Sequence, residues 1–178
     1  NDIMCIQEHH LHEFERSKLQ EMFPDYSCDA KSYDQISLLD PSHKPAAGRG
    51  GVATLWKRQL DPHVTRSPKE GNERILVVTF ETPGNKPICI INCYLPSGNA
   101  AAAIELFLED IDLLNELLYK YKTTCQVLLL GDLNVDHHNR NHLKEIKMKQ
   151  LIKEHNLKEL CLEAGHEKTN KQPKLSHA

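Results

Sequence analysis

Three short apolar runs of the sequence each end in polar side chains, and this feature constrains the fold more than any other. The runs and their polar residues are 2–7 with Glu8, 88–95 with Tyr94, and 126–130 with Asp132 and Asn134. A strand holds its side chains rigidly, so polar groups at its end lie at the rim of a sheet, where water and ligand can reach them. The spacing of Asp132 and Asn134 places both on the same side of an extended segment. A carboxylate and an amide at one place can orient a water molecule or hold a phosphate oxygen.

Strand patterns alternate with helical patterns along the chain, which predicts an α/β domain. Further strands are expected at residues 50–57 and 74–82, and the stretch 83–87, with its Pro and Gly residues, is expected to form a hairpin connection to 88–95. Because three strand patterns precede the long helical pattern, we expect antiparallel sheet in the middle of the chain. Residues 126–130 are expected to form a fully buried strand.

Three amphipathic helices are expected. The first covers residues 11–23 and ends at Pro24, the second follows Asn99 as its N-cap, and the third covers residues 143–156. The apolar residues expected to face inward are Leu11, Phe14, Leu19, Met22 and Phe23 in the first, Ile104, Phe107, Leu108, Ile111, Leu114, Leu118 and Tyr121 in the second, and Ile146, Leu151 and Ile152 in the third.

The composition is that of one ordinary globular domain, with 178 residues of which 39% are hydrophobic and 26% charged. The longest apolar stretches fall far short of the roughly 18–20 residues that a membrane span needs, which argues against membrane insertion. The six cysteines form no CxxC pair, and four of them lie in apolar runs, namely Cys5, Cys89, Cys93 and Cys125. Buried reduced thiols and the lack of a secretory pattern predict an intracellular protein, in the nucleus or the cytoplasm.

The net charge of −3 argues against a protein whose whole surface binds nucleic acid. The charge is unevenly distributed, because residues 1–139 carry −7 and residues 140–178 carry +4. The basic segment is therefore a candidate for contact with a phosphate backbone. A solvated helix face formed by its lysines is the simpler alternative.

Each polar group also has an ordinary structural explanation, since Asp132 and Asn134 can start a turn and Glu8 can start a solvated helix. The combination of segments is more specific. The stretches CIQEHHL (5–11), GRGGVATLWK (48–57), ICIINCYLPSG (88–98) and VLLLGDLNVD (127–136) occur in this order over most of the chain. Together they resemble the endonuclease/exonuclease/phosphatase superfamily, and within it the apurinic-endonuclease-like domains that precede the reverse transcriptase of non-LTR retrotransposons.

The resemblance implies a two-sheet sandwich flanked by helices, with four layers in the order αββα. It implies hydrolysis of phosphodiester bonds in DNA with Mg²⁺, or with Mn²⁺ as an alternative. The implied partner is DNA, and the parent chain is expected to continue into a reverse transcriptase. Mg²⁺ prefers hard oxygen ligands and keeps several waters, so one or two carboxylates and a substrate phosphate suffice to hold it.

The resemblance also assigns roles to single residues. Glu8 corresponds to the metal-binding glutamate, Tyr94 to the tyrosine that contacts the scissile phosphate, and Asp132 to the aspartate that positions or deprotonates the attacking water. Asn134 corresponds to the amide that holds this water or a phosphate oxygen. Arg49 and Arg74 are candidates for contact with the DNA backbone, with an ordinary surface role as the alternative.

Family members also carry an earlier strand with an Asn-containing loop and later strands with an Asp and an Asp-His pair. We therefore expect residues 1–178 to be a single partial domain that is incomplete at both ends, and His177 not to be the family histidine. Ser97 stands where many relatives have Asn. Because such residues act as a unit, the chain alone is expected to have negligible nuclease activity, while an intact parent would cleave DNA.

Three alternatives remain open. The chain could belong to a phosphatase or another phosphodiesterase of the same superfamily, or it could be a non-catalytic remnant that serves as a binding module. A transition-metal site could also be built from histidines, although they lack the spacing of known zinc sites. These histidines are His9, His10, His12, His137, His138 and His142.

Overall fold

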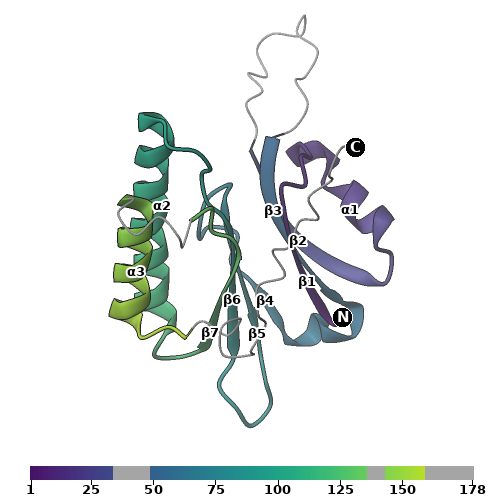
Figure 1. Ribbon diagram of the computed structural model, residues 1–178. Helices are drawn as coiled ribbons and strands as arrows, with labels where there is room; N and C mark the ends of the chain where they lie inside the picture. Colours follow the sequence, from purple (N-terminus) through teal and green to yellow (C-terminus); the bar gives the residue numbers. More distant parts are fainter. Residues whose placement is uncertain (34–48, 136–142, 159–178) are drawn as a thin grey trace, which may run out of the picture.

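The computed structural model describes residues 1–33, 49–135 and 143–158, and it contains two β-sheets packed face to face with helices on both outer sides (Figure 1). Sheet A has the strand order β1-β3-β2, and sheet B has the order β4-β5-β6-β7. The strands are β1 (Ile3–Gln7), β2 (Tyr26–Tyr33), β3 (Arg49–Lys57), β4 (Val64–Arg66), β5 (Ile75–Phe80), β6 (Ile88–Tyr94) and β7 (Gln126–Asp132). The expected arrangement of two sheets with helices is thus confirmed.

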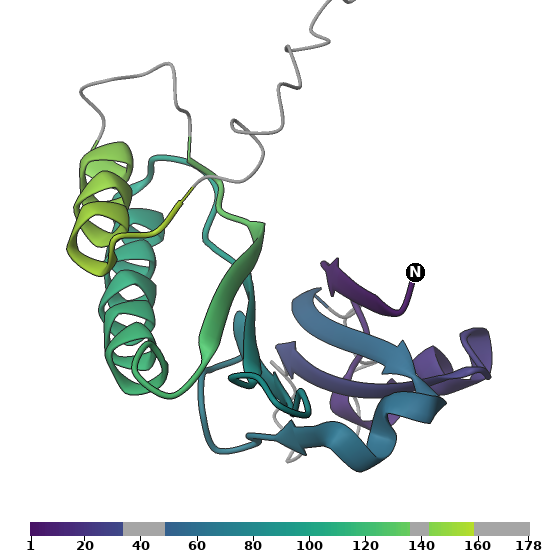
Figure 2. The same ribbon diagram turned by 90° about the horizontal axis from the view of Figure 1, so that it is seen from below.

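The helices lie on the outer faces of the sheets, as the view from below also shows (Figure 2). On sheet A are the 3₁₀ turn η1 (Glu13–Glu15) and α1 (Ser17–Met22), and the 3₁₀ helix η2 (Arg58–His63) connects β3 to β4. On sheet B are α2 (Ala101–Tyr121) and α3 (Leu143–His155). Within the described residues, no helix is both long and apolar enough to cross a membrane.

Three apolar clusters separate these layers. The first packs sheet B against α2 and α3, the second fills the space between the two sheets, and the third packs sheet A against α1. Strand β3 shows why the sequences of these strands are continuously apolar instead of alternating. Its Val52 and Trp56 join the cluster between the sheets, while Ala53 and Leu55 face α1, because successive side chains point to opposite faces.

The strand pairing differs in part from the expected antiparallel sheet. Strands β5 and β6 are antiparallel neighbours joined by the predicted hairpin, but β3 belongs to the other sheet and β7 pairs with β6 in parallel. Strands β2 and β4 were not expected. Their sequences carry many polar residues, so the period-2 apolar pattern is weak.

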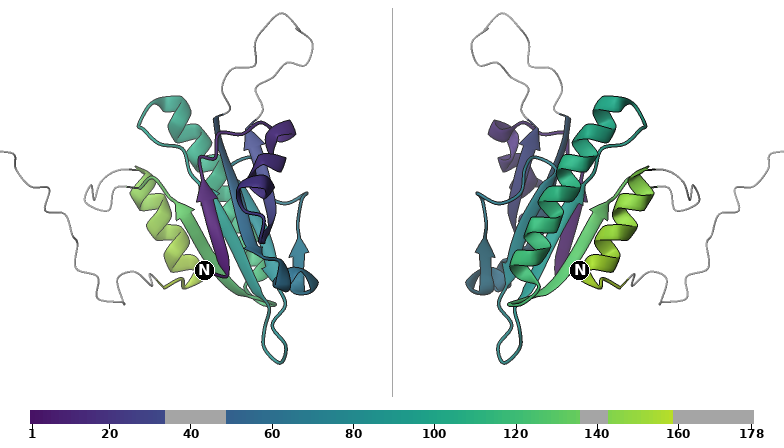
Figure 3. Two further views of the ribbon diagram at one scale, coloured as in Figure 1. Left: turned by 90° about the vertical axis from the view of Figure 1, so that its right-hand side faces the viewer. Right: turned by 90° about the vertical axis from the view of Figure 1, so that its left-hand side faces the viewer.

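Strand β7 lies at the border of sheet B within the described part of the chain, so the expectation of a fully buried strand is wrong. It has half-buried residues, and Leu130 is 38% exposed. An apolar run alone does not distinguish a central strand from an edge strand. Strands β1 and β7 lie close together at the same border of the sandwich (Figure 3).

The first expected helix is shorter than predicted, since only η1 and α1 are helical within residues 11–23. Leu19 is buried as expected, but Phe14 and Met22 are exposed. The 3₁₀ turn changes the number of residues per turn, so a stripe with the α-helical period does not continue through it. The expected inward face of α2 is correct, although its N-cap is Ala100 and not Asn99.

Helix α3 buries Leu151 as expected, and Ile152 is partly buried against the same cluster, but the expectation for Ile146 is wrong. Ile146 is 41% exposed, while Lys144, Met148 and Leu151 face inward and are buried. The Lys144 ammonium donates a hydrogen bond of 2.5 Å to the carbonyl of Pro96 and lies over the Phe107 ring. The inward face thus includes a lysine that the apolar pattern does not reveal.

Candidate active site

Glu8 directly follows β1 and is exposed at the end of sheet A. Its φ of 55° lies in the left-handed region, which is uncommon for a residue with a side chain. The backbone N–H of Glu8 donates to the carbonyl of Gly51 over 2.9 Å, and the N–H of His10 donates to the carbonyl of Gly50 over 3.0 Å. The turn that carries the carboxylate is therefore fixed against the beginning of β3.

The side chain of His9 also stabilises this turn, through contacts with β2 and with Leu11. Its Nε2 lies 2.9 Å from the carbonyl of Lys31, and its Nδ1 accepts a hydrogen bond from the N–H of Leu11 over 3.0 Å. Burial lowers the pKa of His9, which favours the neutral ring that this pair of contacts requires. A Cβ atom on Gly51 would lie 2.4 Å from the ring, which explains the need for glycine there.

Tyr94 is the last residue of β6, and its hydroxyl donates a hydrogen bond to Oε1 of Glu8. This bond to the carboxylate, together with partial burial and the charges of Glu8 and Asp132, raises the pKa of Tyr94 to about 12. A hydrogen bond with Ser97 acts in the opposite direction. The phenol therefore keeps its proton at neutral pH and acts as a hydrogen-bond donor and not as a base.

Asp132 is the last residue of β7 and the register partner of Tyr94 in the parallel pair β6–β7. Its Oδ1 accepts a hydrogen bond of 3.0 Å from the N–H of Asn134, and its carbonyl accepts one of 2.9 Å from the N–H of Leu95. The side-chain amide of Asn134 donates to the carbonyl of Leu95 over 2.9 Å. The turn that Asp132 and Asn134 were considered able to start is thus present. The hydrogen bonds with Leu95 attach both residues to the segment that follows Tyr94.

Gly131 allows β7 to approach β6 closely at this point. Its φ is 127°, and a Cβ atom added there would lie 1.9 Å from the carbonyl oxygen of Cys93. The glycine of the sequence GDLN is therefore required by the backbone contact that places Asp132 beside Tyr94.

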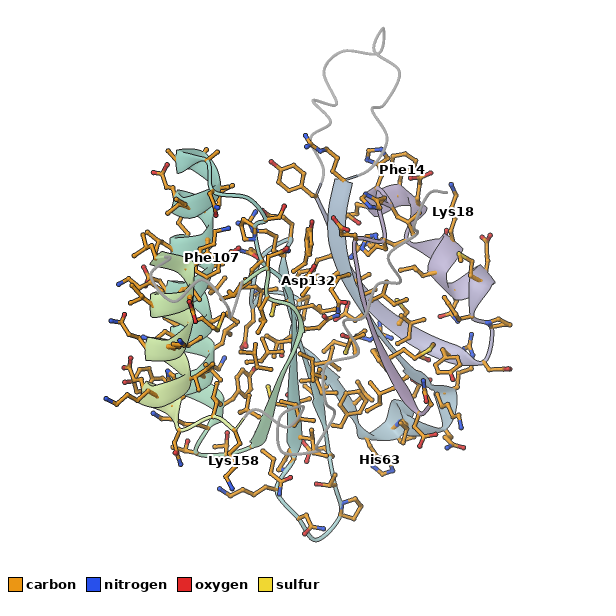
Figure 4. The ribbon with its side chains drawn as sticks, viewed as in Figure 1. Phe14, Lys18, His63, Phe107, Asp132 and Lys158 are labelled. Atoms are coloured by element: carbon orange, nitrogen blue, oxygen red, sulfur yellow. The ribbon has the colours of Figure 1, made fainter. Side chains whose placement is uncertain are left out.

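The structure brings together Glu8, Tyr94 and Asp132, which come from both sheets. Figure 4 shows Asp132 between the two sheets, whereas Phe107 lies on the helical side of sheet B. Both carboxylates are exposed to solvent. The site therefore consists of two solvent-exposed carboxylates and a phenol hydroxyl that donates a hydrogen bond, at one end of the sandwich.

This arrangement fits a magnesium ion held by few protein ligands. Among the described residues, no group of three or more His, Cys, Asp or Glu side chains could hold a metal ion. Mg²⁺ does not require such a cage, because it retains water and is often held by one or two carboxylates and a phosphate. Glu8 and Asp132 supply hard oxygen atoms of this kind.

The two candidate arginines differ in their surroundings. Arg49 is exposed at the start of β3. Arg74 is half-buried and ion-paired, because its Nε lies 2.6 Å from Oδ2 of the buried Asp110 and a second nitrogen also contacts Glu73. Asp110 is fully buried on α2, so the pair connects sheet B to this helix. This pairing favours a structural role for Arg74.

The described histidines of the considered transition-metal site do not converge. His9 is engaged as given above, His12 is buried and stacks on Phe14, and His10 is exposed. His137, His138 and His142 lie outside the described residues, as do Cys161 and His177.

Two residues beneath the site were not singled out from the sequence. Asn92 is fully buried in β6, and its Oδ1 accepts a hydrogen bond of 2.7 Å from Nε2 of Gln7. The available signal was a polar residue in the middle of an otherwise apolar strand. Each residue lies just before a site residue, Gln7 before Glu8 and Asn92 two positions before Tyr94.

The sequence matches the family described as Endonuclease/Exonuclease/phosphatase family over residues 1–144. The chain belongs to this family. Enzymes of the family generally depend on a divalent metal ion. No curated protein sequence matches the chain.

Solved structures of family members show the same fold. A 3′ phosphatase from Neisseria bound to a product DNA hairpin has a TM-score of 0.56 and 16% identity, and the match covers 85% of this chain and 60% of the other. The endonuclease domain of TRAS1, a telomere-specific non-LTR retrotransposon, has a TM-score of 0.54 and 15% identity, with 87% and 58% covered. The catalytic domain of human Nocturnin with bound sulfate has a TM-score of 0.53 and 16% identity, with 85% and 55% covered. The chain thus spans at most about 60% of the length of these structures.

Proposed function

We propose that the chain is part of a retrotransposon-type endonuclease domain that hydrolyses phosphodiester bonds in DNA with Mg²⁺. The observation that carries the proposal is the contact of Tyr94 with Glu8 beside Asp132. These are the residues that the motifs QEHHL, NCYLP and GDLN assign to the site. The motif context around Glu8 and Gly51 supports the retrotransposon branch, and the family membership supports phosphodiester or phosphomonoester chemistry.

Glu8 would hold the metal ion, which when bound supplies positive charge against the charge that develops on the phosphate oxygens. Tyr94 has its proton at neutral pH, and its hydroxyl would turn from Glu8 to donate its one hydrogen bond to a phosphate oxygen. Asp132 would accept a hydrogen bond from the attacking water and direct it towards the phosphorus. Asn134 would contribute the second polar group, held in position by Leu95.

We propose that Arg49 contacts the DNA backbone at the periphery of this site. It is exposed at the start of β3, and the next residue, Gly50, lies beside the Tyr94 ring. Arg74 is left out of the proposed contacts because Asp110 and Glu73 already neutralise it. Its release would leave the buried carboxylate of Asp110 without its ion-pair partner, which is costly.

Full activity is proposed to need the part of the domain that this chain does not share with its longer relatives. Groups in an enzyme site act as a unit, so a partial set typically loses several orders of magnitude in rate. We therefore propose that the 178 residues alone cleave DNA very slowly and that the parent chain cleaves it efficiently.

A nicking assay on supercoiled plasmid in Mg²⁺ tests this proposal. The chain alone should give almost no nicking, and the complete open reading frame should nick the plasmid unless it carries Asp132→Ala. Glu116→Gln, which removes an exposed charge on α2, is the matched control and should leave nicking intact. Nicking by the complete protein that survives Asp132→Ala would refute the assigned site.

A second candidate function is removal of a 3′ phosphate from DNA, because the fold is as similar to the Neisseria 3′ phosphatase as to TRAS1. The same proteins can be given a hairpin with a 3′ phosphate. Release of inorganic phosphate without plasmid nicking would favour this reaction over endonucleolytic cleavage.

A further inference from the structure

Asn92 is a buried polar residue that connects the two sheets. It lies on the face of β6 that points towards sheet A, within the layer that also contains Val78 and Ile90. Its exposed fraction is 0%, and the rest of this layer is largely apolar. A buried amide is costly unless it is hydrogen-bonded, so its partners define its role.

All partners of the Asn92 side chain belong to sheet A. Its Nδ2 donates to the carbonyl of Ala53 on β3 over 2.9 Å and to that of Ile6 on β1 over 3.3 Å. Its Oδ1 accepts the 2.7 Å hydrogen bond from Gln7. Because Ile6 and Ala53 are register partners, one side chain binds two neighbouring strands of the opposite sheet at the same level.

These bonds lie directly beneath the candidate site. On sheet A, Gln7 is followed by Glu8, and on sheet B, Asn92 is followed two positions later by Tyr94. Asp132 is coupled to the same strand, because Leu95 donates to its carbonyl and Gly131 packs against Cys93. The separation between Glu8 and Asp132 therefore depends on how the two sheets are fixed at Asn92.

We propose that Asn92 is a positioning residue that fixes the separation of Glu8 on sheet A from Tyr94 and Asp132 on sheet B. Apolar packing alone is non-directional and permits small shifts between sheets. Three directed hydrogen bonds specify one arrangement. The claim that this spacing serves metal binding rests on the proposed function above. The claim that Asn92 sets the spacing does not depend on it.

Asn92→Leu tests the proposal, because the leucine side chain has the same number and branching of heavy atoms and cannot form these bonds. Val78→Ala is the matched control, since it loosens the same layer but leaves the amide contacts in place. Gln7→Met is a milder variant that removes one of the three hydrogen bonds and decides the matter if Asn92→Leu fails to fold.

The first measurement is independent of metal. The Tyr94 ring lies 3.9 Å from the Cβ position of Gly50 on β3, so a nuclear Overhauser effect between the ring and the Gly50 α protons reports the distance between the sheets. We expect this signal to weaken or disappear in Asn92→Leu and to persist in Val78→Ala. An unchanged signal in Asn92→Leu, or an equal loss in Val78→Ala, would overturn the proposal.

The second measurement is the affinity for Mn²⁺ alone, followed by electron paramagnetic resonance of the free ion. We expect Asn92→Leu to weaken binding by about tenfold, as is typical when the support of a metal ligand is removed. Val78→Ala should leave the affinity unchanged. If the unmodified chain binds no Mn²⁺, the metal site of the proposed function fails, while the Overhauser measurement still decides whether Asn92 sets the spacing.

Discussion

The hydroxyl group of Tyr94 donates a hydrogen bond to the carboxylate of Glu8 and thereby joins the end of β6 to the residue that follows β1. The two residues are 86 positions apart in the sequence and belong to different sheets. Their contact is the most direct link between the two halves of the candidate site. It also makes the protonation of one group depend on the other.

This link predicts a loss of stability at high pH. The pKa of Tyr94 rises from 10.0 to about 12 in the folded chain, so between these values the unfolded chain releases a proton that the folded chain retains. Stability from this group is complete below pH 10 and is lost as pH rises towards 12. The urea midpoint should therefore fall more steeply over this interval in the unmodified chain than in Tyr94→Phe. Parallel curves would contradict the prediction.

Removal of either carboxylate should weaken metal binding without unfolding the chain. Glu8→Gln and Asp132→Asn keep the shape of exposed side chains but lose the charge that attracts a divalent ion. Each is expected to lower Mn²⁺ affinity by about tenfold, which corresponds to about 1.4 kcal/mol. Calorimetric titration measures the affinity, and Glu116→Gln is the control. A loss of affinity in Asp132→Asn no larger than that in Glu116→Gln would show that the charge of Asp132, beside the proposed ligand Glu8, does not act on the ion.

Gly131 should tolerate no side chain. In Gly131→Ala the new Cβ would meet the backbone of Cys93 at 1.9 Å, so strands β6 and β7 would have to separate. The expected cost exceeds about 4 kcal/mol, which is exceptional for one substitution. Gly84 also has a positive φ, of 77° against 127° at Gly131, but no atom lies within 4 Å of its Cβ position, so Gly84→Ala should cost only about 1 kcal/mol. Urea denaturation compares the two, and equal costs would show that close strand contact is not the cause.

The ion pair of Arg74 and Asp110 should matter for stability. Arg74→Met leaves the fully buried Asp110 carboxylate without its cation and is expected to cost about 3 kcal/mol. The pair of Lys120 and Glu70 provides the comparison, because Lys120 is exposed to solvent and Lys120→Met should cost much less than Arg74→Met. If Arg74→Met is as stable as the unmodified chain but its DNA affinity falls less steeply with salt concentration, Arg74 contacts a phosphate.

The sequence predicted the main strands and the long helix well, because these elements have a clear apolar period. Strands 50–57, 74–82 and 88–95 correspond to β3, β5 and β6 within two residues at each end. The assignment of strands to sheets was harder. Whether β3 pairs with β5 or lies across from it depends on long-range packing, and both faces of β3 are buried in either case.

The candidate site was predictable as a set of residues but not as a geometry. Strand ends that carry Glu8, Tyr94 and Asp132 are visible in the sequence, and the structure places them together. The partner of Arg74 was not predictable, because Asp110 was not distinguished among the acidic residues of α2. The role of Asn92 was also hidden, since two of its three partners are backbone carbonyls of the other sheet, which the residue types do not reveal.

The origin of the two carboxylates on different sheets has a thermodynamic consequence. A ligand that contacts Glu8 and Asp132 together can bind only while the sheets are packed, so it adds its binding energy to the free energy of unfolding. At a concentration one hundred times its dissociation constant, this contribution is about 2.7 kcal/mol. A substitution at either carboxylate would then reduce heat resistance more in the presence of the ion than in a chelator. The metal ion proposed for the reaction would then also act as a folding ligand for the domain.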